Sequence, residues 1–117
     1  MATFKGGNPF KLVRRLVLDG GFNTETLGAT RVLLDRDAHV QKLDPGGSAR
    51  EVDLRKATKG DWFLIVNAAD ASENLTIKQP DSSTTLATVN QNEAALVFVE
   101  DTGLTWTLGF VFTIALS

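Results

Sequence analysis

Short apolar runs separated by polar turn residues follow one another along most of the chain from Thr30 onward. Runs of this kind, rich in Val, Ile, Phe and Thr, are typical of β-strands. We predict strands over residues 30–34, 39–43, 49–54, 62–67, 75–78, 86–89, 94–99, 105–108 and 110–116. No long helical pattern follows residue 30. The pattern predicts an all-β fold, an antiparallel β-sandwich or jelly-roll-like barrel with an N-terminal arm.

The sharpest turn signal is Asp44-Pro45-Gly46-Gly47. Proline presets one turn dihedral, and glycine accepts positive φ without a steric penalty. A strand with a charged side follows this corner. We expect its apolar residues Ala49, Val52 and Leu54 to face the interior. The charged residues of the strand are expected to face water or a partner; they are Arg50, Glu51, Asp53 and Arg55.

The first 28 residues are interpreted as an arm with a first structural element, ahead of a sandwich domain over residues 29–117. The stretch FKLVRRLVL, residues 10–18, fits two conformations. Phe10, Val13 and Val17 fit one stripe of a helix that starts at Asn8-Pro9 and stops at Gly20-Gly21. The same residues also fit a strand rich in β-branched side chains. The sequence leaves both conformations open.

Three stretches are more continuously apolar than a strand with one wet face requires: residues 62–66, 94–99 and 110–116. Strands that are apolar on both faces must be covered on both sides. Either a closed barrel with the arm folded across it or a second subunit supplies that cover, and we favour the second subunit. The predicted subunit interface consists of Trp62, Leu64, Phe98, Phe110 and Phe112.

Composition limits the possible functions. The 117 residues fit one domain, and 12 basic against 14 acidic residues give a net charge of −2, with no basic surplus to attract nucleic acid or anionic lipid. There are no cysteines, which excludes disulfides and cysteine nucleophiles. The N-terminal residues contain no apolar run of the length expected of a signal peptide or a membrane span.

No group of residues predicts catalysis. His39 is the only histidine, whereas metal sites usually combine several ligands. The sequence has no phosphate-binding Gly-Lys-Ser/Thr loop and no calcium-loop spacing. Trp62 and Trp106 are interpreted as core or interface anchors rather than as stacking platforms for bases or sugars. We therefore expect no catalytic residue, no metal ligand and no cofactor, and no enzymatic activity.

Residues 40 to about 107 resemble a module of small structural proteins of tailed bacteriophages. The segments that carry the resemblance, in order, are VQKLDPGGSAREVDL, GDWFLIVNAADASENLTIK and TLATVNQNEAALVFVEDTGLTW. Proteins with this module are commonly head decoration, or cement, proteins, and related modules occur in tail and fibre components. The ending EDTGLTW departs from the module's tight Asp-Gly turn. The first forty residues and FVFTIAL lie outside the resemblance.

The resemblance implies a non-enzymatic virion protein, made in the host cytoplasm, that binds the major capsid protein on the outer surface of the capsid. It also implies a homo-trimer or homo-dimer, with no nucleic acid and no membrane as partner. An apolar arm without a core of its own needs a surface, so the predicted capsid contacts are Phe4, Phe10, Leu12 and Val13. One alternative is a tail or tail-fibre module that binds a host surface or a glycan. A cupin-like enzyme is a more distant alternative, because that class needs a cluster of histidines.

Overall fold

The structure is a computed structural model that describes residues 21–99 and 107–113, and every regular element in these ranges is a β-strand. The all-β sandwich predicted from the sequence is confirmed. The strands are β1 (Phe22–Thr26), β2 (Arg31–Leu34), β3 (Val40–Asp44), β4 (Arg50–Lys56), β5 (Trp62–Asn67), β6 (Leu75–Lys78), β7 (Thr85–Val89), β8 (Glu93–Val99) and β9 (Thr107–Thr113).

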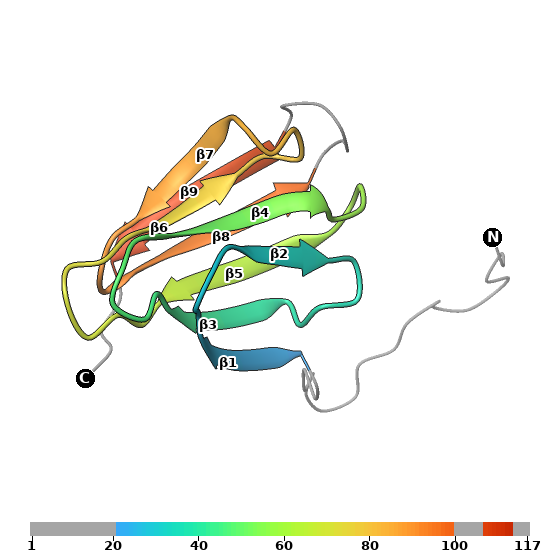
Figure 1. Ribbon diagram of the computed structural model, residues 1–117. Coiled ribbons are helices and arrows are strands. Elements are labelled where there is room, and N and C mark those ends of the chain that lie inside the picture. The colour runs from blue at the N-terminus through green and yellow to red at the C-terminus, as the bar shows by residue number, and fades with distance from the viewer. Residues whose placement is uncertain (1–20, 100–106, 114–117) are drawn as a thin grey trace, which may run out of the picture.

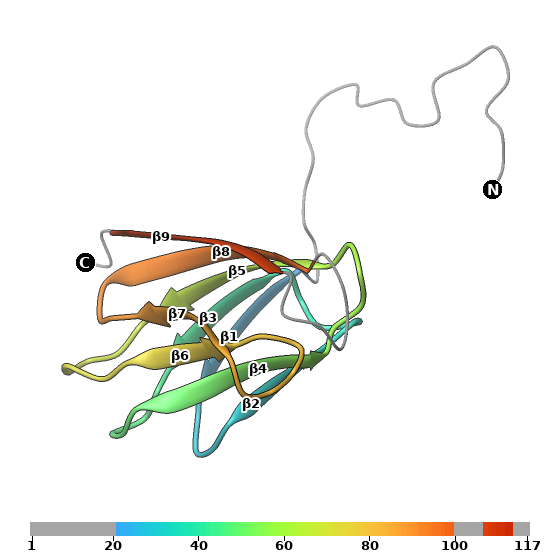
Figure 2. The same ribbon diagram turned by 90° about the horizontal axis from the view of Figure 1, so that it is seen from above.

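The strands form two sheets that pack as two layers (Figures 1 and 2). One sheet has five strands in the order β1-β3-β5-β8-β9, and the other has four in the order β2-β4-β6-β7. Over its first six strands the chain changes sheet at every connection. Over the described ranges, no helix has the length and apolar character needed to cross a membrane.

The strand pairing differs from the antiparallel arrangement that the sequence predicted. The pairs β1–β3, β3–β5, β2–β4 and β4–β6 are parallel, whereas β5–β8, β6–β7 and β8–β9 are antiparallel. A chain that alternates between two sheets returns to each sheet in the same direction, so its neighbouring strands there are parallel. Alternation of apolar and polar residues has the same period in both kinds of strand, and for this reason the pattern could not distinguish them.

Two predicted boundaries also change. The described parts of the expected strands 105–108 and 110–116 belong to one strand, β9, in which Gly109 pairs with Val97 inside an unbroken ladder. Strand β1 was not predicted as a strand, because FNTET is almost entirely polar. Its pairing with β3, rather than its own composition, makes it a strand.

The core lies between the two sheets. Its largest fully buried apolar side chains are Phe63, Leu33, Leu43, Leu54, Ile65, Leu75, Ile77, Val52, Val89 and Val97. The prediction that Val52 and Leu54 face the interior is confirmed, but Ala49 is exposed. Asp53 was expected to face water or a partner and is buried. Its carboxylate accepts hydrogen bonds from the Arg55 N–H and the Ser82 hydroxyl, which offset part of the cost of burial.

Candidate functional site: the apolar outer face of the five-stranded sheet

The outward side of the five-stranded sheet carries a row of large apolar residues. The register aligns Phe22 of β1 with Val40 of β3, Val40 with Leu64 of β5, and Leu64 with Leu96 of β8. With about 4.8 Å between strands, the row runs for about 14 Å across the sheet. Trp62 and Phe98 pair in the next position along the same two central strands. We call these six residues the apolar face.

The alternation of burial shows that this face is directed away from the core. On β5, Phe63 and Ile65 are buried, whereas Trp62 and Leu64, which alternate with them along the strand, are only half-buried. Phe22 is 61% exposed and Phe98 is 39% exposed. The other four residues of the face, Val40, Trp62, Leu64 and Leu96, are half-buried. A contiguous set of aromatic and aliphatic side chains that reaches the surface in this way is characteristic of a surface that binds another macromolecule. This face can supply apolar contact area but no acid, base or nucleophile.

The structure brings together part of the predicted subunit interface. Trp62, Leu64 and Phe98 all lie on the apolar face. The backbone register extends the row to β9, where Phe110 pairs with Leu96 and Phe112 pairs with Ala94. The predicted capsid contacts Phe4, Phe10, Leu12 and Val13 lie outside the described residues.

Three residues of the face were not predicted. Val40 and Leu96 occupy strands that the sequence identified. Each lies two residues from another outward-facing residue of its strand, and the alternation of side chains along a strand could therefore have placed both on this face. Phe22 carried no such signal, because it is isolated among polar residues. Only the parallel register with β3 brings Phe22 next to Val40.

His39 fixes the position of Trp62 at one end of the face. The two rings are stacked with centroids 4.1 Å apart and an angle of 2° between their planes. The His39 Nδ1 atom lies 2.7 Å from the Trp62 carbonyl oxygen, which accepts its hydrogen bond. The only histidine of the chain therefore supports an aromatic residue of the apolar face.

Two corners of the chain, Asp44-Pro45-Gly46-Gly47 after β3 and Asn67-Ala68 at the end of β5, have structural roles. Gly46 and Gly47 have φ angles of 76° and 96°, as the turn requires. Asn67 is fully buried, and its amide donates to the carbonyl oxygens of Glu73 and Val89 at 2.7 and 2.9 Å. Its side-chain oxygen accepts the N–H of Ala69. These residues shape the module that carries the apolar face.

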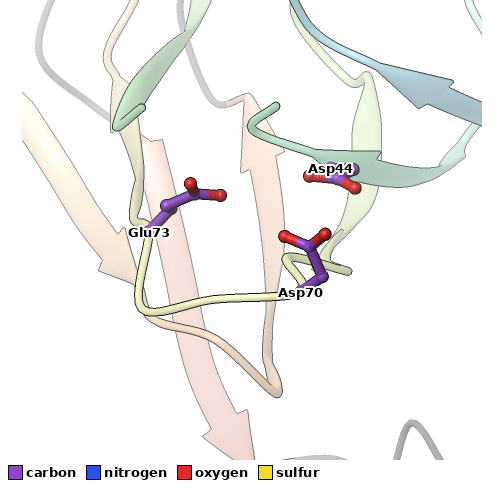
Figure 3. Close-up of side chains that lie close together, drawn as sticks. All are labelled: Asp44, Asp70 and Glu73. Atoms are coloured by element: carbon purple, nitrogen blue, oxygen red, sulfur yellow. The ribbon is translucent and has the colours of Figure 1, made fainter. Parts of the chain in front are cut away.

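Three carboxylates converge where β3 and the β5–β6 connection meet. Asp44, Asp70 and Glu73 each offer an oxygen within 4.8 Å of the others (Figure 3). One Glu73 oxygen is shielded from solvent and has no hydrogen-bond partner. Carboxylates are the ligands that calcium prefers, but calcium takes six to eight oxygens, and Asp70 is exposed. This geometry alone does not define a metal centre.

Comparisons with known proteins leave the family open. No protein-family model matches the chain, and no match was found among curated proteins or solved structures. The resemblance to phage decoration proteins therefore stays a prediction that rests on the sequence segments given above.

Proposed function

We propose that the protein is a capsid decoration protein that binds the outer surface of a tailed-phage head and stabilises the lattice of the major capsid protein. The apolar face carries this proposal, because a small protein with outward-facing Phe22 and Phe98 is suited to assembly rather than to chemistry. The sequence motifs between residues 40 and 107, which resemble those of phage decoration proteins and follow the same order, support the assignment of this assembly to a phage head.

In this proposal the apolar face joins copies of the chain, and the N-terminal arm contacts the capsid. Interfaces between permanent subunits are more apolar than transient ones and resemble a protein core cut in half. An oligomer presents several arms at once, so that modest individual contacts act together at a high effective concentration. Such an oligomer bridges neighbouring capsid subunits and resists their separation.

A tail or tail-fibre module is the second candidate. The observation that favours it is the position of Trp62 and Phe98 on a sheet face, where aromatic side chains could also bind a glycan. A glycan site, however, needs polar groups beside the aromatic rings to orient the sugar. In the row of residues next to Phe22, Val40 and Leu64, the described strands supply two polar side chains that could serve in this way, those of Lys42 and Thr24.

Co-sedimentation with expanded heads that lack the protein tests the proposal. We expect saturable binding at a fixed ratio to the major capsid protein, and that ratio identifies the lattice position. A folded protein that does not bind heads, but binds host cells or glycans, would support the tail or fibre function instead.

A further inference from the structure

Strand β1, which lies beside β3 in the five-stranded sheet (Figure 1), differs from the other strands in what it buries. Each of β2 to β8 contributes at least one apolar side chain to the core between the sheets, such as Leu33 of β2 and Leu43 of β3. Among the described residues, the core contains none from β1. The apolar side chain of β1 is Phe22, which lies on the apolar face and is 61% exposed. Hydrophobic burial, the main stabilising term of folding, therefore does little to hold β1.

Polar side chains take the place of core residues on the inner side of β1. The register places Asn23 beside Gln41, which is fully buried. The Asn23 amide donates to the Gln41 side-chain oxygen at 2.8 Å and to Glu25 Oε1 at 3.1 Å. The Gln41 amide donates in turn to the carbonyl oxygen of Ala38 at 2.8 Å. Each such hydrogen bond stabilises the folded state less than a buried large apolar side chain does.

Two ion pairs connect β1 with β2 and with the turn that follows it. Arg31 Nε lies 3.1 Å from Glu25 Oε1, and Arg31 Nη2 lies 3.3 Å from Asp37 Oδ1. The side chains of Arg31, Glu25 and Asp37 are 25%, 39% and 19% exposed. Water and dissolved ions therefore reach these charges and weaken their attraction. The side-chain contacts that hold β1 are thus modest and sensitive to salt.

The residue after β1 marks where firm attachment to the core begins. Leu27 is 4% exposed and belongs to the core, and its N–H donates to the Asp44 carbonyl oxygen at 2.7 Å. Gly46 approaches Leu27 so closely that a Cβ at Gly46 would overlap the Leu27 carbonyl oxygen. Residues 22–26 can therefore separate from β3 while Leu27 stays packed in the core.

We propose that β1 opens locally, away from β3, without unfolding of the rest of the sandwich. Segments with few buried apolar contacts open at a much lower free energy than the core of the same protein. Opening withdraws Phe22 from the row that it forms with Val40 and Leu64. The closed state of β1 thus gives the apolar face its full width, and the ion pairs of Arg31 regulate that width. The opening itself does not depend on the proposed function, whereas its effect on assembly rests on that function.

Hydrogen exchange at two amides of the same sheet tests the proposal on the protein alone. The Val40 N–H donates to the Gly21 carbonyl oxygen, next to β1, whereas the Leu64 N–H donates to the His39 carbonyl oxygen. After correction for intrinsic rates, we expect the Val40 amide to exchange at least about a hundredfold faster than the Leu64 amide. Equal protection of the two amides would mean that β1 opens only when the whole domain unfolds, and would overturn the proposal.

A core substitution in the other sheet separates local opening from global unfolding. Ile77→Val removes one methylene group from a fully buried side chain of β6. It should speed exchange of the Leu64 amide about fivefold, because that amide exchanges when the domain unfolds. The Val40 amide should exchange at its natural rate, because Ile77 keeps its contacts when β1 opens alone. An equal change at both amides would overturn the proposal.

The substitution Glu25→Gln tests the regulation by the ion pairs. It retains a side-chain oxygen that accepts hydrogen bonds but removes the charge that attracts Arg31. We expect it to speed exchange of the Val40 amide about two- to fivefold at low salt. In about 1 M salt, which screens the charges, the variant and the natural protein should exchange alike. The matched control Glu51→Gln, at an exposed position of β4, should have no effect. Equal Val40 exchange in the two variants at low salt would overturn the regulation by the ion pairs.

Discussion

The imidazole of His39 lies flat against the indole of Trp62, 4.1 Å away, and the same histidine is hydrogen-bonded to the Trp62 backbone. These two contacts hold Trp62 from both its ring and its main chain. They connect the start of β3 with the start of β5, where the apolar face meets the loops.

Replacing His39 by Ala should therefore loosen Trp62. The change removes one stacked pair and one hydrogen bond, and we expect it to lower the free energy of unfolding by about 1–2 kcal/mol. In a Trp106→Phe background, Trp62 is the only tryptophan, so the tryptophan fluorescence comes from it alone. The maximum of this fluorescence emission should shift to longer wavelength in His39→Ala. The exposed Lys59→Ala should change neither quantity. Unchanged emission and stability in His39→Ala would contradict this role.

Gly46→Ala should destabilise the fold more than an ordinary glycine substitution. A Cβ at Gly46 would overlap the carbonyl oxygen of Leu27, and the residue has a φ of 76°. We expect a loss of about 2 kcal/mol or more, measured by denaturant unfolding. Gly28→Ala is the matched control, because a Cβ there meets nothing within 4 Å. Equal effects of the two substitutions would show that the close approach of Gly46 to Leu27 is unimportant.

Asn67→Ala should be among the most damaging single changes. It leaves the carbonyl oxygens of Glu73 and Val89 and the N–H of Ala69 without the partners that they have now. Unpaired buried polar groups cost about 1–3 kcal/mol each, so we expect a total loss of at least about 3 kcal/mol. Gln91→Ala, which removes a single bond to the Ala69 carbonyl oxygen, should cost less than about 1 kcal/mol. A small effect at Asn67 would mean that water replaces its contacts.

The sequence predicted most strands because their apolar residues recur with the period of a sheet. Trp62–Asn67 and Leu75–Lys78 were predicted with their observed boundaries. Pairing direction could not be predicted, because it depends on which sheet each connection enters rather than on local composition. Phe22 was missed for a related reason: its neighbours on the face come from distant parts of the chain.

Local sequence pattern also predicted part of the candidate site but not the contacts that depend on distant parts of the chain. Continuous apolar stretches identified Trp62, Leu64 and Phe98, because an alternating strand would not need both faces apolar. Sequence reasoning directed Asp53 towards water or a partner from its charge alone. The Ser82 hydroxyl that contacts its carboxylate comes from a turn 29 residues later, which local pattern cannot reveal.

Stability at acid pH should depend on Asp81. Hydrogen bonds from the Thr84 hydroxyl, the Thr84 N–H and the Ser83 N–H lower the pKa of its carboxyl group from 3.8 to about 2. The folded state thus favours the charged form, so the contribution is complete above about pH 4 and is lost as the pH falls towards 2. Asp81→Asn should reduce the fall in stability across this window, and Thr84→Val should reduce it partly. Identical acid unfolding curves for Asp81→Asn and the natural protein would contradict the assignment.

Binding to heads by a variant of the apolar face tests the central claim most directly. The titration compares the natural protein with Phe98→Asp and with Thr88→Asp, an exposed position on the other sheet. The natural protein and Thr88→Asp should saturate heads at the same ratio. Phe98→Asp should bind with an apparent affinity about a hundredfold lower, because a dissociated subunit loses the benefit of several linked contacts. Equal binding by Phe98→Asp and Thr88→Asp, or no saturable binding by the natural protein, would contradict the account.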